Sequence, residues 1–305
     1  METPAHAVSA DLIAVLVAVT VGQPRVTTID GGSALPSGPF AHDERSLQSG
    51  LRTWVERQTG HRLGYVEQLY TFADRDRATK GDRVISISYL ALTRENREGT
   101  ESGWQDWYSY FPWEDHRSGL PRLLPGIVAR LRAWTKATAT PAQRRDRWRR
   151  VAVSFGLDDR PWNEELVLQR YELLYEAALV AEASHGQSGD DATPVLGRSM
   201  LFDHRRILAT GIARLRAKIK YRPVVFELMS PTFTLLQLQR TVEALAGRLV
   251  HKQNFRRLIE QQELVEETGA IAAAASGRPA KLFRFRRDVV DERAVTGTKL
   301  PLTRA

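Results

Sequence analysis

The spacing of hydrophobic positions predicts several strands in the first hundred residues. Residues 12–21 form an apolar run rich in Val, without internal Gly or Pro, which is typical of a central strand buried on both faces. Residues 25–29 are a second strand candidate, and residues 65–72 and 84–93 are two more. In the last of these, apolar positions alternate with serines, as in a strand with one buried face.

A single helix interrupts this series of strands. A loop rich in Gly and Pro, residues 31–39, precedes it. Over residues 46–59, one helical face carries the apolar side chains Leu47, Leu51, Trp54 and Val55, and Gly60 follows as a stop signal. The order strand, strand, loop, helix, strand, strand predicts an α/β sandwich.

Two further helices lie near the C-terminus, and the second is basic. Residues 234–246 are amphipathic, start with a capping box of Thr234 and Gln237, and stop before Gly247. After a short turn, a helix from residue 251 has an apolar face, for which we expect burial, formed by Phe255, Leu258 and Ile259. Its opposite face carries Lys and Arg, so the pair is typical of a helix-turn-helix.

The residues that follow predict the wing of a winged helix. Residues 264–268 read as a strand, residues 269–277 as a loop of small residues, and residues 281–286 alternate Phe with Arg or Lys. Donor-rich side chains suit phosphates and base edges in a major groove. The residues that we expect to contact DNA are Lys252, Gln253, Asn254, Arg256 and Arg257 from the helix, and Arg278, Lys281 and Arg284 from the wing.

The middle of the chain is mainly helical. Helices are predicted over residues 120–136, 141–155 and 163–183, after an aromatic block at residues 104–113 that packs in a core or forms a binding surface. We therefore expect an effector-sensing domain at 1–200 with a helical insertion at about 114–184 and a flexible segment at 185–199. After these we expect a linker helix at 201–222, a DNA-binding domain at 223–290 and a tail at 291–305.

Charge is distributed unevenly over the 305 residues. Residues 203–305 carry 20 Lys and Arg against 10 Asp and Glu, while the remainder carries 24 against 26. A generally basic surface would not be so lopsided, so this surplus indicates nucleic-acid binding by the C-terminal third. A second group of arginines, residues 144–150, is interpreted as a solvated helix face.

Cysteine is absent, which excludes disulfides and thiolate metal sites and fits the cytoplasm. The longest apolar run, residues 12–21, is about half of a membrane span. No Lys or Arg precedes it, so it does not have the form of a signal peptide. We expect neither membrane insertion nor a membrane partner.

Residues 35–60 resemble a Nudix box that has lost its chemistry. Aligned on Gly60, the three metal-binding carboxylates of that family correspond to Trp54, Arg57 and Gln58. Divalent cations such as Mg²⁺ need oxygen ligands, so we expect no metal, no catalytic residue and no required cofactor. The resemblance implies a Nudix-like α/β/α sandwich and nominates Arg45, Arg52 and Glu56 for effector binding, although surface salt links explain these residues equally well.

The C-terminal half resembles the NrtR-like, Nudix-related transcriptional regulators of NAD metabolism. Four segments stand in that family's order, namely residues 202–208, 233–239, 254–257 and 277–285, and the helical insertion is most similar to the NadQ-type branch. The resemblance implies a homodimeric repressor of NAD biosynthesis genes. It would bind palindromic double-stranded DNA and sense an adenine nucleotide, namely ATP, NAD or ADP-ribose.

Two other functions remain open from the sequence. A Nudix hydrolase of nucleoside diphosphate derivatives is disfavoured, because Trp54, Arg57 and Gln58 cannot hold Mg²⁺. An RNA-binding or adaptor protein is disfavoured because the C-terminal segment lacks the interleaved aromatic residues of RNA-binding modules.

Overall fold

A computed structural model of the protein describes residues 8–41, 44–72, 83–94, 103–184, 196–272 and 279–286, together with Asp288. Arg278, residues 185–195 of the expected flexible segment, and the expected tail at 291–305 lie outside this range. Among the helices of the described part, none is both long and apolar enough to cross a bilayer.

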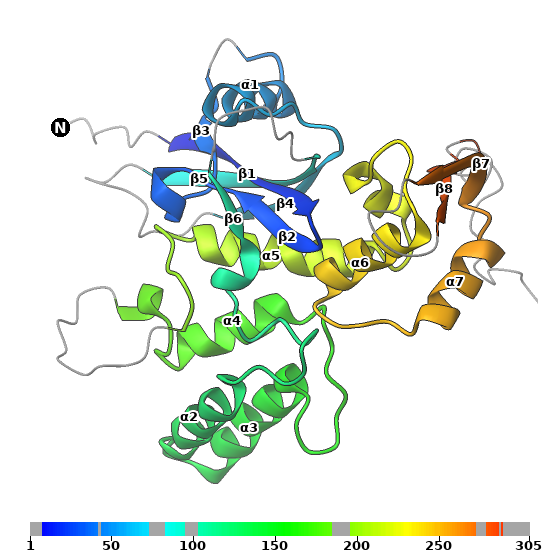
Figure 1. Ribbon diagram of the computed structural model, residues 1–305. Coiled ribbons are helices and arrows are strands. Elements are labelled where there is room, and N and C mark those ends of the chain that lie inside the picture. The colour runs from blue at the N-terminus through cyan, green and yellow to red at the C-terminus, as the bar shows by residue number, and fades with distance from the viewer. Residues whose placement is uncertain are drawn as a thin grey trace, which may run out of the picture.

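A mixed sheet forms the centre of the N-terminal body (Figure 1). Its strands follow the order β4–β5–β1–β2–β6, with β3 paired to β1. The strands are β1 (Val8–Thr20), β2 (Gln23–Thr27), β3 (Ser37–Pro39), β4 (Val66–Phe72), β5 (Arg83–Leu92) and β6 (Trp104–Asp106). The central strand β1 runs parallel to β5 and antiparallel to β2 and β3.

Helices cover both faces of this sheet, which explains the continuous apolar run in β1. Leu12, Ala14 and Leu16 pack in one cluster with α1 (Leu47–Thr59), while the intervening residues of β1 belong to the core on the other face. On that second face lies α5 (His204–Lys218), as Figure 1 shows. A Cβ on Gly211 of α5 would lie 2.9 Å from a methyl group of Val15, so this glycine permits the close approach of helix and strand. The helix expected as a linker is thus a layer of the sandwich.

The insertion after β6 contains three α-helices. They are α2 (Leu124–Lys136), α3 (Pro141–Phe155) and α4 (Val167–Glu176), with short 3-10 helices η3 (Trp107–Ser109) and η4 (Ala181–Ser184) at its ends. The helix predicted over 163–183 is shorter than expected, because Ala178 has a left-handed φ of 55°. Within the aromatic block, Trp107, Tyr110 and Trp113 are fully buried, so it is a core patch.

The C-terminal part has the predicted winged-helix order. After the 3-10 helix η5 (Pro223–Leu228) come α6 (Leu235–Ala246), α7 (Lys252–Gln261), β7 (Val265–Ala272) and β8 (Ala280–Phe285). The capping box of α6 forms, and Gly247 ends the helix in the left-handed conformation with a φ of 71°. Strand β7 is longer than the predicted 264–268 and takes in the start of the expected loop. The predicted sandwich with a helical insertion and a winged helix is confirmed.

Candidate nucleic-acid interface and nucleotide cleft

Helix α7 touches the rest of the protein along a narrow strip. Phe255 and Ile259, four residues apart, are each only 9% exposed, and they pack into the core that α6 and the wing share. Leu258 is 51% exposed, so its predicted burial is wrong. The helix projects from the side of the molecule, as Figure 1 shows, and a strip this narrow leaves Leu258 outside the contact.

The remaining faces of α7 offer free hydrogen-bond donors. The side chains of Lys252, Gln253, Asn254, Arg256 and Arg257 are exposed, and within the described part of the chain none has a hydrogen-bond or ion-pair partner. The N-cap residue His251 gives the helix no side-chain cap, so backbone N–H groups of the first turn are also available. Unpaired cations beside a free helix N-terminus suit an anion such as phosphate.

Two cations of the wing, Lys281 and Arg284, are already paired. Lys281 Nζ lies 2.8 Å from a carboxylate oxygen of Glu267, and Arg284 Nε lies 2.5 Å from one of Glu266. These pairs are solvent-exposed and therefore contribute little stability, so exchange of carboxylate for phosphate costs little. Contact of the wing with DNA, as the sequence predicts, requires that exchange.

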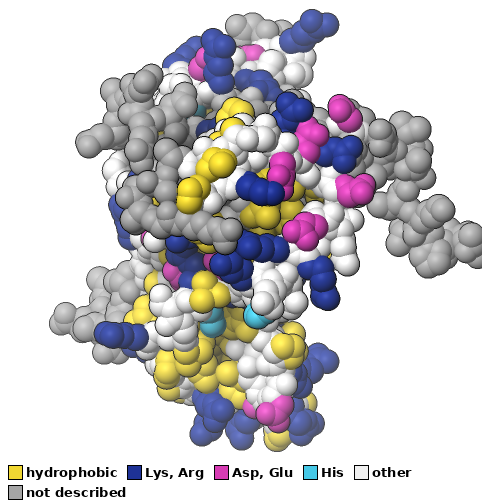
Figure 2. Space-filling model, turned by 45° about the vertical axis from the view of Figure 1, so that its right-hand side comes forward, with side chains coloured by type: hydrophobic (Ala, Val, Ile, Leu, Met, Phe, Trp, Pro, Cys, Tyr) yellow, Lys and Arg dark blue, Asp and Glu magenta, His cyan; other side chains and the backbone are white. Residues whose placement is uncertain are grey.

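The charge surplus of the C-terminal third lies mostly outside the winged helix. Residues 225–285 hold eight cationic and six acidic side chains, and Figure 2 shows the two signs intermixed in the upper half of the molecule. Residues 203–222 hold seven cations against one carboxylate, and six of these cations form ion pairs: Arg205, Arg206, Arg214, Arg216, Lys218 and Lys220. The surplus expected to mark a DNA-binding surface is therefore largely used in internal pairing.

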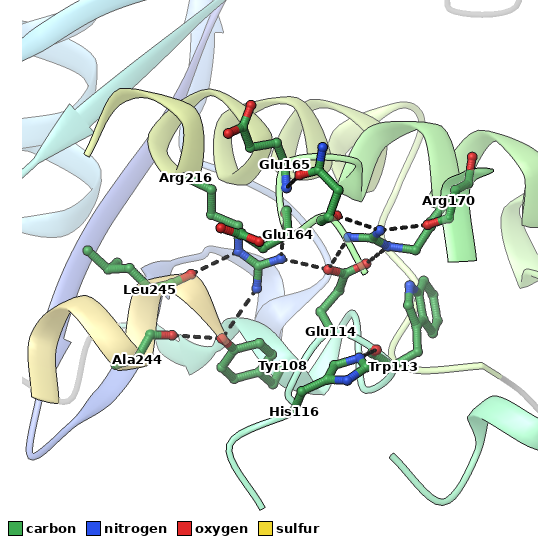
Figure 3. Close-up of polar contacts among 12 residues, drawn as sticks. Tyr108, Trp113, Glu114, His116, Glu164, Glu165, Arg170, Arg216, Ala244 and Leu245 are labelled. Atoms are coloured by element: carbon green, nitrogen blue, oxygen red, sulfur yellow. Dashed lines mark hydrogen bonds and ion pairs between the residues drawn. The ribbon is translucent and has the colours of Figure 1, made fainter. Parts of the chain in front are cut away.

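The C-terminal end of α6 is fixed by donors from the body of the protein (Figure 3). The Tyr108 hydroxyl donates to the carbonyl of Ala244 at 2.7 Å, and Arg216 Nε donates to that of Leu245 at 2.8 Å. The backbone N–H of His116 donates to the carbonyl of Gly247 at 2.7 Å. The last carbonyls of a helix have no partner within the helix, so these three bonds anchor the winged helix to the sandwich.

Arg216 also belongs to a buried ionic group, here called the Glu114 cluster and formed by Glu114, Arg170 and Arg216 (Figure 3). Arg170 lies 2.5 Å from one carboxylate oxygen of Glu114, and Arg216 lies 2.6 Å from the other. None of the three side chains is more than 1% exposed. Burial alone would raise the pKa of Glu114, but the charges of Arg170 and Arg216 outweigh it and lower that pKa.

Two of the residues that the sequence aligns with Nudix metal positions, Trp54 and Gln58, hold strand β3 in place. Trp54 Nε1 donates to the carbonyl of Pro39 at 2.9 Å, and the ring lies directly over Gly38. Gln58 accepts from the N–H of Ser37 at 3.0 Å and donates to its carbonyl at 2.8 Å. Among the described residues, no group of three His, Cys, Asp or Glu side chains is placed to bind a metal ion.

A cleft of about 480 Å³ opens beside the end of α1. Polar side chains and glycines line most of it: Thr27, Thr28, Asp30, Gly31, Gly32, Gln58, Thr59, Gly103 and Gln105. The hydroxyl of Thr27 is buried there without a hydrogen-bond partner among the described residues. Such a volume fits a small ligand.

The three nominated effector residues lie elsewhere on α1 and its approach, and none of them lines this cleft. Arg52 donates to the carbonyls of Leu63 and Gly64, and Glu56 pairs with Arg62 at 3.2 Å. Arg45 is exposed in the turn before the helix. The structure thus brings Gln58 and Thr59, rather than the nominated three, to the cleft.

Comparison with known proteins identifies the C-terminal part. Residues 225–285 match the family model of the NrtR DNA-binding winged helix domain. The chain therefore carries a winged helix domain of the NrtR type. Its whole fold is similar to that of Shewanella oneidensis NrtR complexed with a 27mer DNA, at 21% identity and a TM-score of 0.51, over 92% of this chain and 95% of the other. A second crystal structure of Shewanella oneidensis NrtR gives the same TM-score at 19% identity over the same shares of the two chains. These two likenesses show that the sandwich and the winged helix together have the fold of the NrtR structures.

A curated relative supports the same assignment. The ADPR responsive transcriptional repressor NtrR of Acinetobacter baylyi is 32% identical over 130 residues, which is 42% of this chain. The chain spans about half the length of that relative, 51%. The likeness in fold to NrtR extends over both domains, whereas the family match covers only the winged helix.

Proposed function

We propose that this NrtR-like chain is a repressor that binds palindromic double-stranded DNA as a homodimer and responds to an adenine nucleotide. The observation that carries the proposal is the outward face of α7, where five donor-bearing side chains have no partner in the described structure. Solvated lysines and arginines on a helix that is otherwise held by Phe255 and Ile259 are available to a major groove.

Within α7 we assign base reading to Gln253 and Arg256 and phosphate contact to Lys252. Arg256 is one turn from Lys252, so the two side chains share a face of the helix. Arg presents a planar fork that suits guanine, whereas Lys binds phosphate as a point charge. Lys281 and Arg284 of the wing would then contact backbone phosphates by releasing Glu267 and Glu266.

For the effector we propose an adenine nucleotide of the ADP-ribose class, with ATP and NAD as alternatives. The curated relative is named as ADPR responsive, and the cleft beside α1 has the volume and the polar lining that a nucleotide needs. Gly31 allows a ligand to approach the backbone closely there, because no other atom lies within 4 Å of where its Cβ would be. The unpartnered hydroxyl of Thr27 offers it a hydrogen bond. Arg45, Arg52 and Glu56 stay as predicted contacts for a part of the ligand outside the cleft.

Coupling between the two functions would pass through the end of α6. The cleft and the winged helix meet the same segment, because Gln105 lines the cleft and Tyr108 holds the carbonyl of Ala244. A nucleotide that moves residues 103–108 would therefore tilt α6 and, with it, α7. Control of DNA binding requires that the nucleotide prefer one arrangement, typically by about 1–3 kcal/mol.

We further propose that the chain is not a Nudix hydrolase. Trp54 and Gln58 occupy former metal positions and are committed to strand β3, and Arg57 stacks over Trp54 at 5.1 Å. A cation at that site would repel Mg²⁺, and neither an indole nor a guanidinium can coordinate it. If the protein released AMP from ADP-ribose in the presence of Mg²⁺ at a rate above that of buffer alone, this part of the proposal would be contradicted.

The proposal is tested by binding to the palindromic operator found by footprinting upstream of NAD biosynthesis genes, the class of target that the sequence resemblance implies. Fluorescence anisotropy should show that Arg256→Ala lowers operator affinity by about 1–3 kcal/mol and relaxes the preference for operator over random duplex. The matched control is Arg57→Ala, an arginine on α1, the helix at the top of Figure 1, whereas α7 lies at its right. Equal affinities of wild type and Arg256→Ala would overturn the assignment of α7. Titration with ADP-ribose, NAD and ATP identifies the effector.

A further inference from the structure

The most basic region of the molecule is the α2–α3 lobe, which we define as residues 121–156. It carries nine Lys and Arg and one Asp, a net charge of +8, as large as the net charge of the whole 305-residue chain. In Figure 1 the lobe lies beyond α4 and α5, on the side away from the sheet, and in Figure 2 basic side chains gather at its lower end. The proposed DNA-binding function of α7 does not use it.

Among the residues that the structure describes, most of these cations have no carboxylate to neutralise them. Arg149 pairs with Asp146 at 2.7 Å, and Arg150 pairs with Glu176 of α4 at 2.6 Å. Within the described chain, the other seven form no ion pair: Arg122, Arg130, Arg132, Lys136, Arg144, Arg145 and Arg147. The contrast with residues 203–222, where nearly every cation is paired, shows that these side chains do not serve internal neutralisation.

Two arginines of the lobe are fixed in position by tryptophans. Arg132 of α2 lies over the Trp148 ring of α3 at 4.7 Å, and Arg147 of α3 lies over the Trp134 ring of α2 at 4.2 Å. A guanidinium stacked on an aromatic face keeps the N–H donors at its edge directed outward. Such a side chain loses less conformational entropy on binding a phosphate than a free one does.

This concentration of charge also works against the stability of the lobe. Arg145 and Arg149 are separated by one helical turn, a spacing at which like charges destabilise a helix. Arg144 and Arg145 lie in the N-terminal half of α3, where the helix dipole does not favour cations. A polyanionic partner would remove both costs by neutralising the charges.

We propose that the α2–α3 lobe binds the phosphate backbone of double-stranded DNA flanking the operator. The inference rests on the proposed function, since α7 would bring the flanking duplex to the protein. The exposed arginines offer donors to phosphates, and the contact would be independent of sequence. A membrane surface fits less well, because an interfacial helix needs a continuous apolar face, whereas among the exposed residues of α3 only Val153 is a large hydrophobic one.

The test compares two duplexes and two charge-matched variants. One duplex is trimmed to the palindrome, and the other is extended at each end by one helical turn, about 10 bp. The variant Arg144→Gln/Arg145→Gln removes two unpaired cations, and the control Arg149→Gln/Arg150→Gln removes two that already have carboxylate partners. Both variants change the net charge equally, so long-range attraction alone affects them equally. Circular dichroism establishes that α3 remains folded in each.

On the extended duplex, we expect Arg144→Gln/Arg145→Gln to reduce the slope of log K against log salt by about 0.9 for each lost contact, hence about 1.8. On the trimmed duplex, this variant should match the wild type. Equal slopes for the two variants on the extended duplex, or tighter binding of RNA or anionic vesicles than of the extended duplex, would overturn the inference. Arg256→Ala separates the two proposals, since it should weaken both duplexes whatever the lobe does.

Discussion

Replacement of Glu114 by glutamine should lower the free energy of unfolding by about 3–5 kcal/mol. The substitution keeps the size of the side chain but removes the charge that faces Arg170 and Arg216, which are both 0% exposed. Two guanidinium ions would remain in the interior without a counter-charge, and a broken buried ion pair typically costs this much. Urea-induced unfolding, followed by tryptophan fluorescence and far-UV circular dichroism, measures the change.

The matched control is Glu176→Gln, which breaks the pair with Arg150 where both side chains are about 40% exposed, at 40% and 44%. This change should cost less than about 1 kcal/mol. A loss below about 1 kcal/mol for Glu114→Gln would refute the reasoning, since it would mean that water or another acid reaches these arginines.

Three further outcomes are expected. The stability that the charged Glu114 contributes should be intact above its ordinary pKa of 4.5 and should be lost as the pH falls through its lowered folded pKa. Urea unfolding between pH 7 and pH 3 measures this loss in the wild type, and Glu114→Gln should lack it. Gln58→Ala removes two hydrogen bonds to Ser37 and should cost about 1–3 kcal/mol with faster amide exchange in β3, whereas the exposed Gln48→Ala should not. Lys281→Ala should weaken all duplexes evenly and reduce the salt slope by about 1, and a sequence-dependent loss would contradict a phosphate contact.

The sequence predicts elements well where periodicity and end signals agree. The capping box at Thr234, the stop at Gly247 and the doubly buried β1 are all confirmed, because each depends on local chemistry or on a period that only one structure satisfies. The predicted burial of Leu258 is wrong, because the exposure of a side chain on α7 depends on how many other elements pack against that helix. Periodicity alone does not contain that information.

The Glu114 cluster escaped the sequence analysis, although a signal for it exists. Arg216 stands four residues after Ile212 on the apolar face of α5, and Arg170 stands four residues before Leu174 on that of α4. A cation on an apolar helical stripe must find a buried partner, so its position predicts an ion pair. The identity of that partner, Glu114, comes from tertiary packing, since it lies 56 residues from Arg170 and 102 from Arg216 in sequence.

The three bonds that hold the end of α6 bear on whether a winged helix can be exchanged between proteins. A DNA-binding domain joined by a flexible linker could be exchanged between proteins, and the protein that received it would bind the same DNA sequence. Here a transplanted module would leave the carbonyls of Ala244 and Leu245 unsatisfied unless Tyr108 and Arg216 were transferred with it. Chimeras that also carry Tyr108 and Arg216 should retain the proposed regulation. Chimeras fused at residue 223 should bind their operator without responding to the nucleotide.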